Sequence, residues 1–175
     1  FDGRPLAGLS TEKRARLGLM LVPEDRRIFP HLTVAQNLEL AAHATPRGAT
    51  PLSVAEICER FPMLKTLTER QGYQLSGGQQ QVLAVARGIV PRPRLLLLDE
   101  PAEGLAPLIV QELAEEVRRI REDMAAALLL AEQNVAFARH CTDYVCLLDT
   151  GRVVFSGTWE AFDAQPELKT RYLAV

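Results

Sequence analysis

Apolar residues follow two different spacings along this chain. Short continuous apolar runs of strand length occupy residues 19–22, 94–99 and 126–131. Between these runs, apolar residues recur at every third or fourth position, as they do on one face of a helix. They are Val82, Leu83, Ala86, Ile89 and Val90 in the first such stretch, and Val110, Leu113, Val117 and Ile120 in the second. The alternation predicts an α/β domain with a largely parallel sheet covered on both faces.

Several helix starts are marked by a hydroxyl residue followed three positions later by Gln or Glu, the spacing of a capping box. The pairs are Thr33 with Gln36, Ser53 with Glu56, and Ser76 with Gln79. The first helix is expected to run to about residue 42. The second is expected to end near residue 60, because Pro62 stops it.

Smaller signals complete the predicted elements. Ser10 caps a helix over 11–17, and Asn134 caps another that ends near residue 140. Residues 143–148 and 152–155 flank an Asp-Thr-Gly turn and predict a hairpin, followed by a helix over 158–173 interrupted at Pro166. The first four residues read as the end of a strand entering an Asp-Gly turn, so we expect the sequence to begin inside a longer protein.

Composition narrows the class of protein. The 175 residues carry 20 Lys+Arg against 22 Asp+Glu, and this balance argues against a nucleic-acid partner. The longest apolar run covers only residues 124–131, too short to span a bilayer. The three cysteines, Cys58, Cys141 and Cys146, fit no zinc pattern and are expected to be buried free thiols.

Residues 75–79 read Leu-Ser-Gly-Gly-Gln and stand just before a predicted helix. The adjacent Gly77 and Gly78 let the backbone approach a ligand closely. The helix N-terminus offers unpaired N–H groups and the positive end of its dipole, and the Ser76 hydroxyl adds a donor, a combination suited to phosphate. For an isolated Ser-Gly-Gly, a plain helix cap with a tight turn is the better interpretation.

Residues 95–101 read Leu-Leu-Leu-Leu-Asp-Glu-Pro, which places two carboxylates at the end of a buried strand. Ligands bind at the C-terminal ends of such strands, and buried carboxylates need a partner. Mg²⁺ with nucleotide phosphates would serve, with Asp99 holding the metal directly or through water and Glu100 polarising the attacking water. A helix-capping acid pair is the alternative, and alone this pattern is a weak signal.

Together, in this order and spacing, the two segments resemble the signature and Walker B motifs of ATP-binding cassette (ABC) ATPases. Residues 21–34, 104–107 and 131–134 resemble the family's Q-loop region, D-loop and switch region. The resemblance covers essentially the whole chain and is greatest to the ATPase subunit of branched-chain amino-acid importers, with urea importer ATPases as the nearest competitors. It implies a P-loop NTPase-like α/β fold, with a parallel-sheet core and a helical subdomain.

The resemblance also implies a domain plan. Residues 1–175 would form a partial ABC ATPase domain, with a helical subdomain at about 33–75, a core over 76–157 and C-terminal helices over 158–175. The phosphate loop, Gly-x-x-x-x-Gly-Lys-Ser/Thr, occurs nowhere in the sequence. We expect it, with the N-terminal strands, to precede Phe1 in the complete protein, and these 175 residues alone to bind ATP poorly and to be inactive.

Three positions depart from the general family pattern. Glu24 replaces the Q-loop Gln, Gln133 replaces the switch His, and Ala106 replaces the D-loop Asp. All three resemble the branched-chain importer subgroup. The resemblance implies a catalytic role for Gln133 together with Glu100, but Gln133 can contact the γ-phosphate only through hydrogen bonds, because it cannot titrate. Glu24 would repel phosphate unless a metal or water intervenes, so it is interpreted as a coupling residue more than a ligand.

The resemblance finally implies the cofactors, ATP and Mg²⁺, and the partners. The residues that would contact the γ-phosphate of ATP bound to a second ATPase subunit are Ser76, Gly77, Gly78 and Gln79. Residues 26–29 would meet membrane permease subunits, with a periplasmic solute-binding protein as an indirect partner. The alternative is that Ile28 and Phe29 are core residues and that the two arginines form a solvated face. The protein would lie peripherally at the cytoplasmic face of the inner or plasma membrane. A non-catalytic ABC-like interaction module, or a non-transport cassette acting on DNA or ribosomes, is the alternative.

Overall fold

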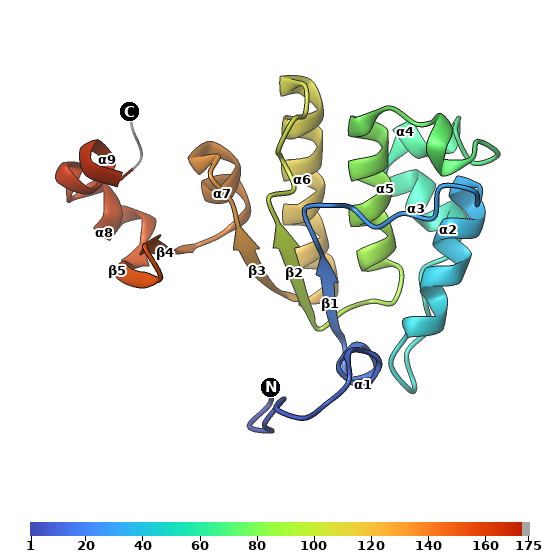
Figure 1. Ribbon diagram of the computed structural model, residues 1–175, viewed down its shortest axis with the longest axis horizontal. Coiled ribbons are helices and arrows are strands. Elements are labelled where there is room, and N and C mark those ends of the chain that lie inside the picture. The colour runs from blue at the N-terminus through green and yellow to red at the C-terminus, as the bar shows by residue number, and fades with distance from the viewer. Residues whose placement is uncertain (173–175) are drawn as a thin grey trace.

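The three predicted strands lie side by side in one parallel sheet (Figure 1). The computed structural model of the chain describes residues 1–172. Its sheet contains β1 (Leu19–Val22), β2 (Leu95–Asp99) and β3 (Ala127–Ala131) in that spatial order, with the first residues of the three strands in register. The carboxyl ends of all three strands therefore meet at one edge, where ligands bind in sheets of this kind.

The helices begin close to where the sequence predicts. They are α1 (Thr11–Arg16), α2 (Val34–Ala41), α3 (Val54–Arg60), α4 (Pro62–Lys65), α5 (Gly77–Ile89), α6 (Pro107–Met124), α7 (Val135–Cys141), α8 (Trp159–Asp163) and α9 (Pro166–Tyr172). All three predicted capping boxes are formed, at the starts of α2, α3 and α5. Pro62 does more than end α3, because it opens α4 at a first-turn position where no backbone N–H is needed. Residue 173, the predicted end of the last helix, lies outside the described residues.

One face of the sheet is covered and the other is largely exposed, so the prediction of cover on both faces is wrong for residues 1–172. On the covered face α5 approaches closely at Gly88, where a side chain would have no room: a Cβ there would lie 2.6 Å from Val22. On the opposite face Leu21 is 63% exposed and Leu129 is 59% exposed. Apolar residues on both faces of a strand predict burial on both, but the described helices pack against only one.

Helices α2, α3 and α4 lie beyond α5 on the side away from β3, within the predicted helical subdomain (Figure 1). The segment that leads into α2 is held by Asn37, a residue of α2 that is fully buried. Its side chain accepts the N–H of Phe29 and donates to the carbonyls of Phe29, Leu32 and Thr33. The segment that precedes α2 is therefore held by an internal polar anchor rather than by apolar packing alone.

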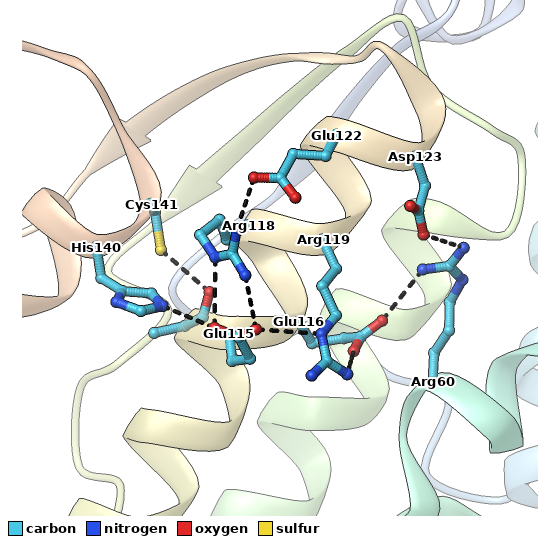
Figure 2. Close-up of polar contacts among 10 residues, drawn as sticks. Arg60, Glu115, Glu116, Arg118, Arg119, Glu122, Asp123, His140 and Cys141 are labelled. Atoms are coloured by element: carbon cyan, nitrogen blue, oxygen red, sulfur yellow. Dashed lines mark hydrogen bonds and ion pairs between the residues drawn. The ribbon is translucent and has the colours of Figure 1, made fainter.

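Helix α6 carries an ion-pair cluster that joins α3 to α7 (Figure 2). Arg60 of α3 contacts Glu116 at 3.2 Å and Asp123 at 2.9 Å. On the α7 side, His140 contacts Glu115 at 3.0 Å. Hydrogen bonds from Arg118 and then from His140 lower the pKa of Glu115 to about 2, whereas burial raises the pKa of Glu116. Helix α6 is thereby tied to its neighbours on both sides.

The C-terminal part lies at the opposite end of the molecule from α2–α4 (Figure 1). It contains the predicted hairpin, β4 (Tyr144–Asp149) and β5 (Arg152–Thr158), followed by α8 and α9. It is attached to α7 by the Arg139–Asp163 ion pair at 2.7 Å, and the Trp159 indole N–H donates to the Thr142 carbonyl.

Two smaller expectations need correction. Cys58 and Cys141 are buried as predicted, but Cys146 is exposed, because its position in β4 faces outward from the hairpin. At the other end of the chain, Asp2 and Gly3 form the predicted turn in left-handed conformations, whereas Phe1 is not in a strand.

Candidate functional site

The end of β2 brings two sequence-predicted site residues into contact. The Glu100 N–H donates to the Ala131 carbonyl at 2.9 Å, which keeps Glu100 beside the end of β3. The side-chain amide of Gln133 then donates to the Glu100 carboxylate at 2.8 Å. Glu100 has a φ of +44°, a left-handed conformation that costs a non-glycine residue about 1–2 kcal/mol. Strain of this kind persists where surrounding contacts fix the backbone, and it is concentrated at functional sites.

The turn that carries Gln133 is fixed by its neighbour Glu132. One carboxylate oxygen of Glu132 accepts the N–H groups of Gln133 and Asn134, both at 3.0 Å. The other oxygen accepts the N–H of Ala102 at 3.2 Å, in the turn that follows β2. Asn134 caps α7, as predicted, by accepting the N–H of Phe137. The ends of β2 and β3 are thus joined by side chains as well as by the sheet.

An open cavity of about 540 Å³ lies beside Glu100. It is lined by Glu24, Asp25, Arg26, Arg27, Ile28, Pro30, Gln80, Gln81, Glu100, Glu103 and Gly104. The structure therefore brings Glu24 and Glu100 to one cavity, although they come from different strand ends. Four carboxylates against two guanidinium groups make its lining net negative, so a phosphate group would need an accompanying cation here.

The signature segment opens at the start of α5. The Ser76 hydroxyl accepts the N–H of Gln79, and the Gln79 side chain accepts the N–H of Ser76. A Cβ built on Gly77 would lie 3.3 Å from Arg26, and one built on Gly78 would lie 3.6 Å from Leu105. The lining of the cavity beside Glu100 does not include residues 76–78. These residues nevertheless adjoin the cavity, because Gly77 approaches Arg26 of its lining and Gly78 approaches Leu105, the neighbour of lining residue Gly104.

A loop between β1 and α2 is clamped onto α5 by contacts that the sequence gives no signal for. Arg26 donates to the Gln81 side chain at 3.1 Å. Arg87 donates to the Arg27 carbonyl at 2.7 Å, and its guanidinium lies over the Phe29 ring. Burial lowers the pKa of Arg87. Arg26 and Arg27 both have left-handed φ values. The loop predicted to meet a membrane subunit is thus mechanically connected to the signature helix.

The exposure of this loop is mixed. Phe29 is 41% exposed and Arg27 is exposed, while Ile28 is half-buried against the core. Phe29 is therefore not simply a core residue, and part of its ring remains exposed although the Arg87 guanidinium lies over it. None of the helices within residues 1–172 is long and apolar enough to cross a bilayer.

Asp99 is the residue predicted to hold Mg²⁺, and its side chain carries carboxylate oxygens, the ligand type that Mg²⁺ prefers. It ends β2 and is exposed, directly before Glu100. Within residues 1–172, no group of three or more His, Cys, Asp or Glu side chains is arranged to hold a metal ion.

Comparison with known proteins identifies the family. Residues 1–103 match the family model described as ABC transporter. The chain is 36% identical over 173 residues, 99% of its length and 74% of the relative's, to the high-affinity branched-chain amino acid transport ATP-binding protein BraG of Pseudomonas aeruginosa. It is 33% identical over 158 residues, 90% of its length and 67% of the relative's, to a probable branched-chain amino acid transport ATP-binding protein, LivF, of Archaeoglobus fulgidus. The chain belongs to the ABC transporter family.

Solved structures agree on the fold. An ATP binding subunit of an ABC transporter shares 29% identity and a TM-score of 0.73, over 99% of this chain and 72% of that one. A dimeric ATP-binding cassette in a post-hydrolysis state bound to ADP and Pi superposes with a TM-score of 0.75 at 23% identity, over 90% of this chain and 71% of that one. The predicted α/β ABC ATPase fold is confirmed.

Proposed function

We propose that this chain belongs to the ATP-hydrolysing subunit of an importer for branched-chain amino acids or a similar small polar solute. Its likeness to BraG and LivF carries the proposal, because it spans 99% and 90% of the chain at 36% and 33% identity. The contact between Glu100 and Gln133 supports it, because these are the two residues for which a catalytic role is predicted.

The chemistry assigned to this site is attack of water on the γ-phosphate of ATP. Glu100 accepts a proton from the attacking water, and the neutral Gln133 amide orients the Glu100 carboxylate without competing for that proton. Asp99 would hold Mg²⁺, which when bound offsets negative charge on the phosphate oxygens. Glu24, which lines the same cavity as Glu100, is assigned a coupling role.

The N-terminus of α5 is assigned to contact a nucleotide bound by a second ATPase subunit. Ser76, Gly77, Gly78 and Gln79 lie at a capped helix N-terminus, where backbone N–H groups favour a phosphate. Residues 26–29 are assigned to membrane permease subunits, which would place the protein at the cytoplasmic face of the membrane.

Reconstituted uptake tests the proposal. The complete polypeptide is assembled in lipid vesicles with its second ATPase subunit, its permease subunits and the solute-binding protein, and supplied with magnesium and ATP. We expect ATP-dependent uptake of radiolabelled leucine, isoleucine or valine that far exceeds uptake of urea. Uptake of urea without branched-chain amino acids would assign the protein to a urea importer instead. ATP hydrolysis with no uptake of either solute would contradict the proposed solute class.

A further inference from the structure

We propose that Glu132 is a positioning residue for ATP hydrolysis, because it holds the backbone of Gln133 in place against the turn that carries Glu100. The inference rests on the proposed function. In this role Glu132 binds neither the side-chain amide of Gln133 nor the Glu100 carboxylate. It acts through the main chain on both sides of their contact.

The geometry joins two segments that are far apart in sequence. Oε1 of Glu132 accepts the N–H groups of Gln133 and Asn134, and Oε2 accepts the N–H of Ala102, 30 residues away. A glutamate that served only to shape a local turn would need just the first two contacts. The third contact reaches across to the turn after β2 and spans the same gap as the bond between Gln133 and Glu100.

A carboxylate is the side chain best suited to accept the three N–H groups of Ala102, Gln133 and Asn134. Ionised Glu has two oxygens with about four lone-pair sites and no donor, so it can accept all three bonds. Gln has one acceptor oxygen, and its amide group would face one of these N–H donors. Hydrogen bonds to an ionised acceptor are also stronger than neutral ones. Ala102 is only 7% exposed, and Glu132 is the acceptor of its N–H, so removal of Glu132 takes away this bond and the protection that it gives.

The position of Gln133 depends on these contacts. Gln133 is exposed and its side chain reaches out to donate to Glu100, so packing does not fix it. Its backbone is fixed through Glu132, and Glu100 stands two residues before Ala102 on the opposite turn. Removal of Glu132 therefore loosens both turns, although the sheet still joins the strands, and it weakens the bond between Gln133 and Glu100 even though neither residue is changed.

Amide hydrogen exchange on the complete, nucleotide-free protein tests the structural part. We expect at least about tenfold faster exchange at the amides of Ala102, Gln133 and Asn134 in E132A, and a smaller increase in E132Q. The matched control is T158A, which removes the N-cap bond of α8 far from this site and should leave those three amides unchanged. Wild-type exchange at the Ala102 amide in E132A would overturn the proposal.

A double-mutant cycle with Q133A tests the functional part, on the complete protein assembled with its partner subunits. We expect E132A to lower kcat for ATP hydrolysis at least about tenfold, with little change in KM, because the loss is in the transition state. In the Q133A background, E132A should cause no further loss. Equal, multiplying losses in both backgrounds would overturn the role of Glu132. Wild-type kcat in Q133A would instead show that Gln133 plays no part in hydrolysis, which overturns both this inference and the proposed catalytic role of Gln133.

Discussion

Gln133 and Glu100 lie 33 residues apart in the sequence, and Nε2 of Gln133 donates a hydrogen bond to Oε1 of Glu100 over 2.8 Å. The donor is an amide, which stays neutral at every physiological pH. The Glu100 carboxylate therefore keeps the same hydrogen-bonded neighbour across the pH range in which a histidine at position 133 would change its charge.

This contact predicts how Q133H alters the pH profile of hydrolysis. A histidine titrates near pH ~6.5, and its protonated form beside Glu100 would weaken the carboxylate as a proton acceptor. We expect kcat of Q133H to fall below pH ~6.5 by several-fold more than kcat of the wild type. Steady-state hydrolysis by the assembled complex across this range provides the measurement. Parallel profiles for the two proteins would show that residue 133 does not act on Glu100.

Gly88 is predicted to be intolerant of a side chain. A Cβ at this position would lie 2.6 Å from Val22 and 3.3 Å from Leu96, so G88A should force α5 away from the sheet. Overpacking of this kind lowers the free energy of unfolding by about 1–3 kcal/mol, whereas the better helix propensity of alanine raises it by up to about 1 kcal/mol. Chemical unfolding measures the net loss. V22A makes room for the new methyl group, so G88A should cost less in the V22A background, and equal losses in both would contradict the close approach.

The ion pair between Arg60 and Glu116 is predicted to matter mainly because Glu116 is buried. The Glu116 side chain is 6% exposed, so R60M leaves it without its main partner and should cost about 3 kcal/mol at neutral pH. The double variant R60M/E116L removes the stranded charge and should recover most of the loss. Comparable stability of the single and double variants in urea unfolding would contradict this account.

The same pair predicts a pH dependence with a definite sign. Burial raises the pKa of Glu116 above its ordinary value of 4.5, and removal of Arg60 raises it further. A raised folded-state pKa means that stability falls as the pH rises from 4.5 through the folded-state value. We expect the R60M loss to be smaller near pH 4.5 than near neutral pH. A loss that is larger in acid would contradict the assigned direction.

Asn37 is predicted to be replaceable by neither its acid nor an apolar residue. N37D keeps the shape but cannot donate to the carbonyls of Phe29, Leu32 and Thr33, and a few kcal/mol of stability should be lost. Q111E makes the same amide-to-acid change at an exposed position and should alter stability by less than about 0.5 kcal/mol. Equal effects of the two substitutions on thermal unfolding would show that the buried anchor is unimportant.

Features set by neighbouring residues could be predicted from the sequence. The capping boxes at Thr33, Ser53 and Ser76 are formed as predicted, because an N-cap hydroxyl and the side chain three positions later complete the motif locally. The strands and the hairpin also follow from short patterns. Pro62 shows the limit of such reasoning, because the same residue can end one helix and begin the next.

Features that depend on distant residues could not be predicted in this way. Glu132 looks in the sequence like any acid before a helix, and only the folded chain places Ala102 against it. The clamp of Arg26 on Gln81 is likewise invisible, because no local pattern links a loop to a helix 55 residues away. The roles given to Asp99, Glu100, Gln133, Glu24 and residues 76–79 stay predictions, although the structure places Gln133 on Glu100 and Glu24 beside the same cavity.

Replacement of Glu100 tests the central claim most directly. In the complete protein, assembled with its partner subunits and supplied with magnesium, E100Q keeps the size of the side chain and removes its ability to accept a proton. We expect ATP turnover to fall by about 10²–10⁴-fold, the range for loss of a general base, while ATP binding measured by a fluorescent nucleotide remains close to wild type. Hydrolysis by E100Q at the wild-type rate would contradict the assignment of Glu100 as the residue that activates water.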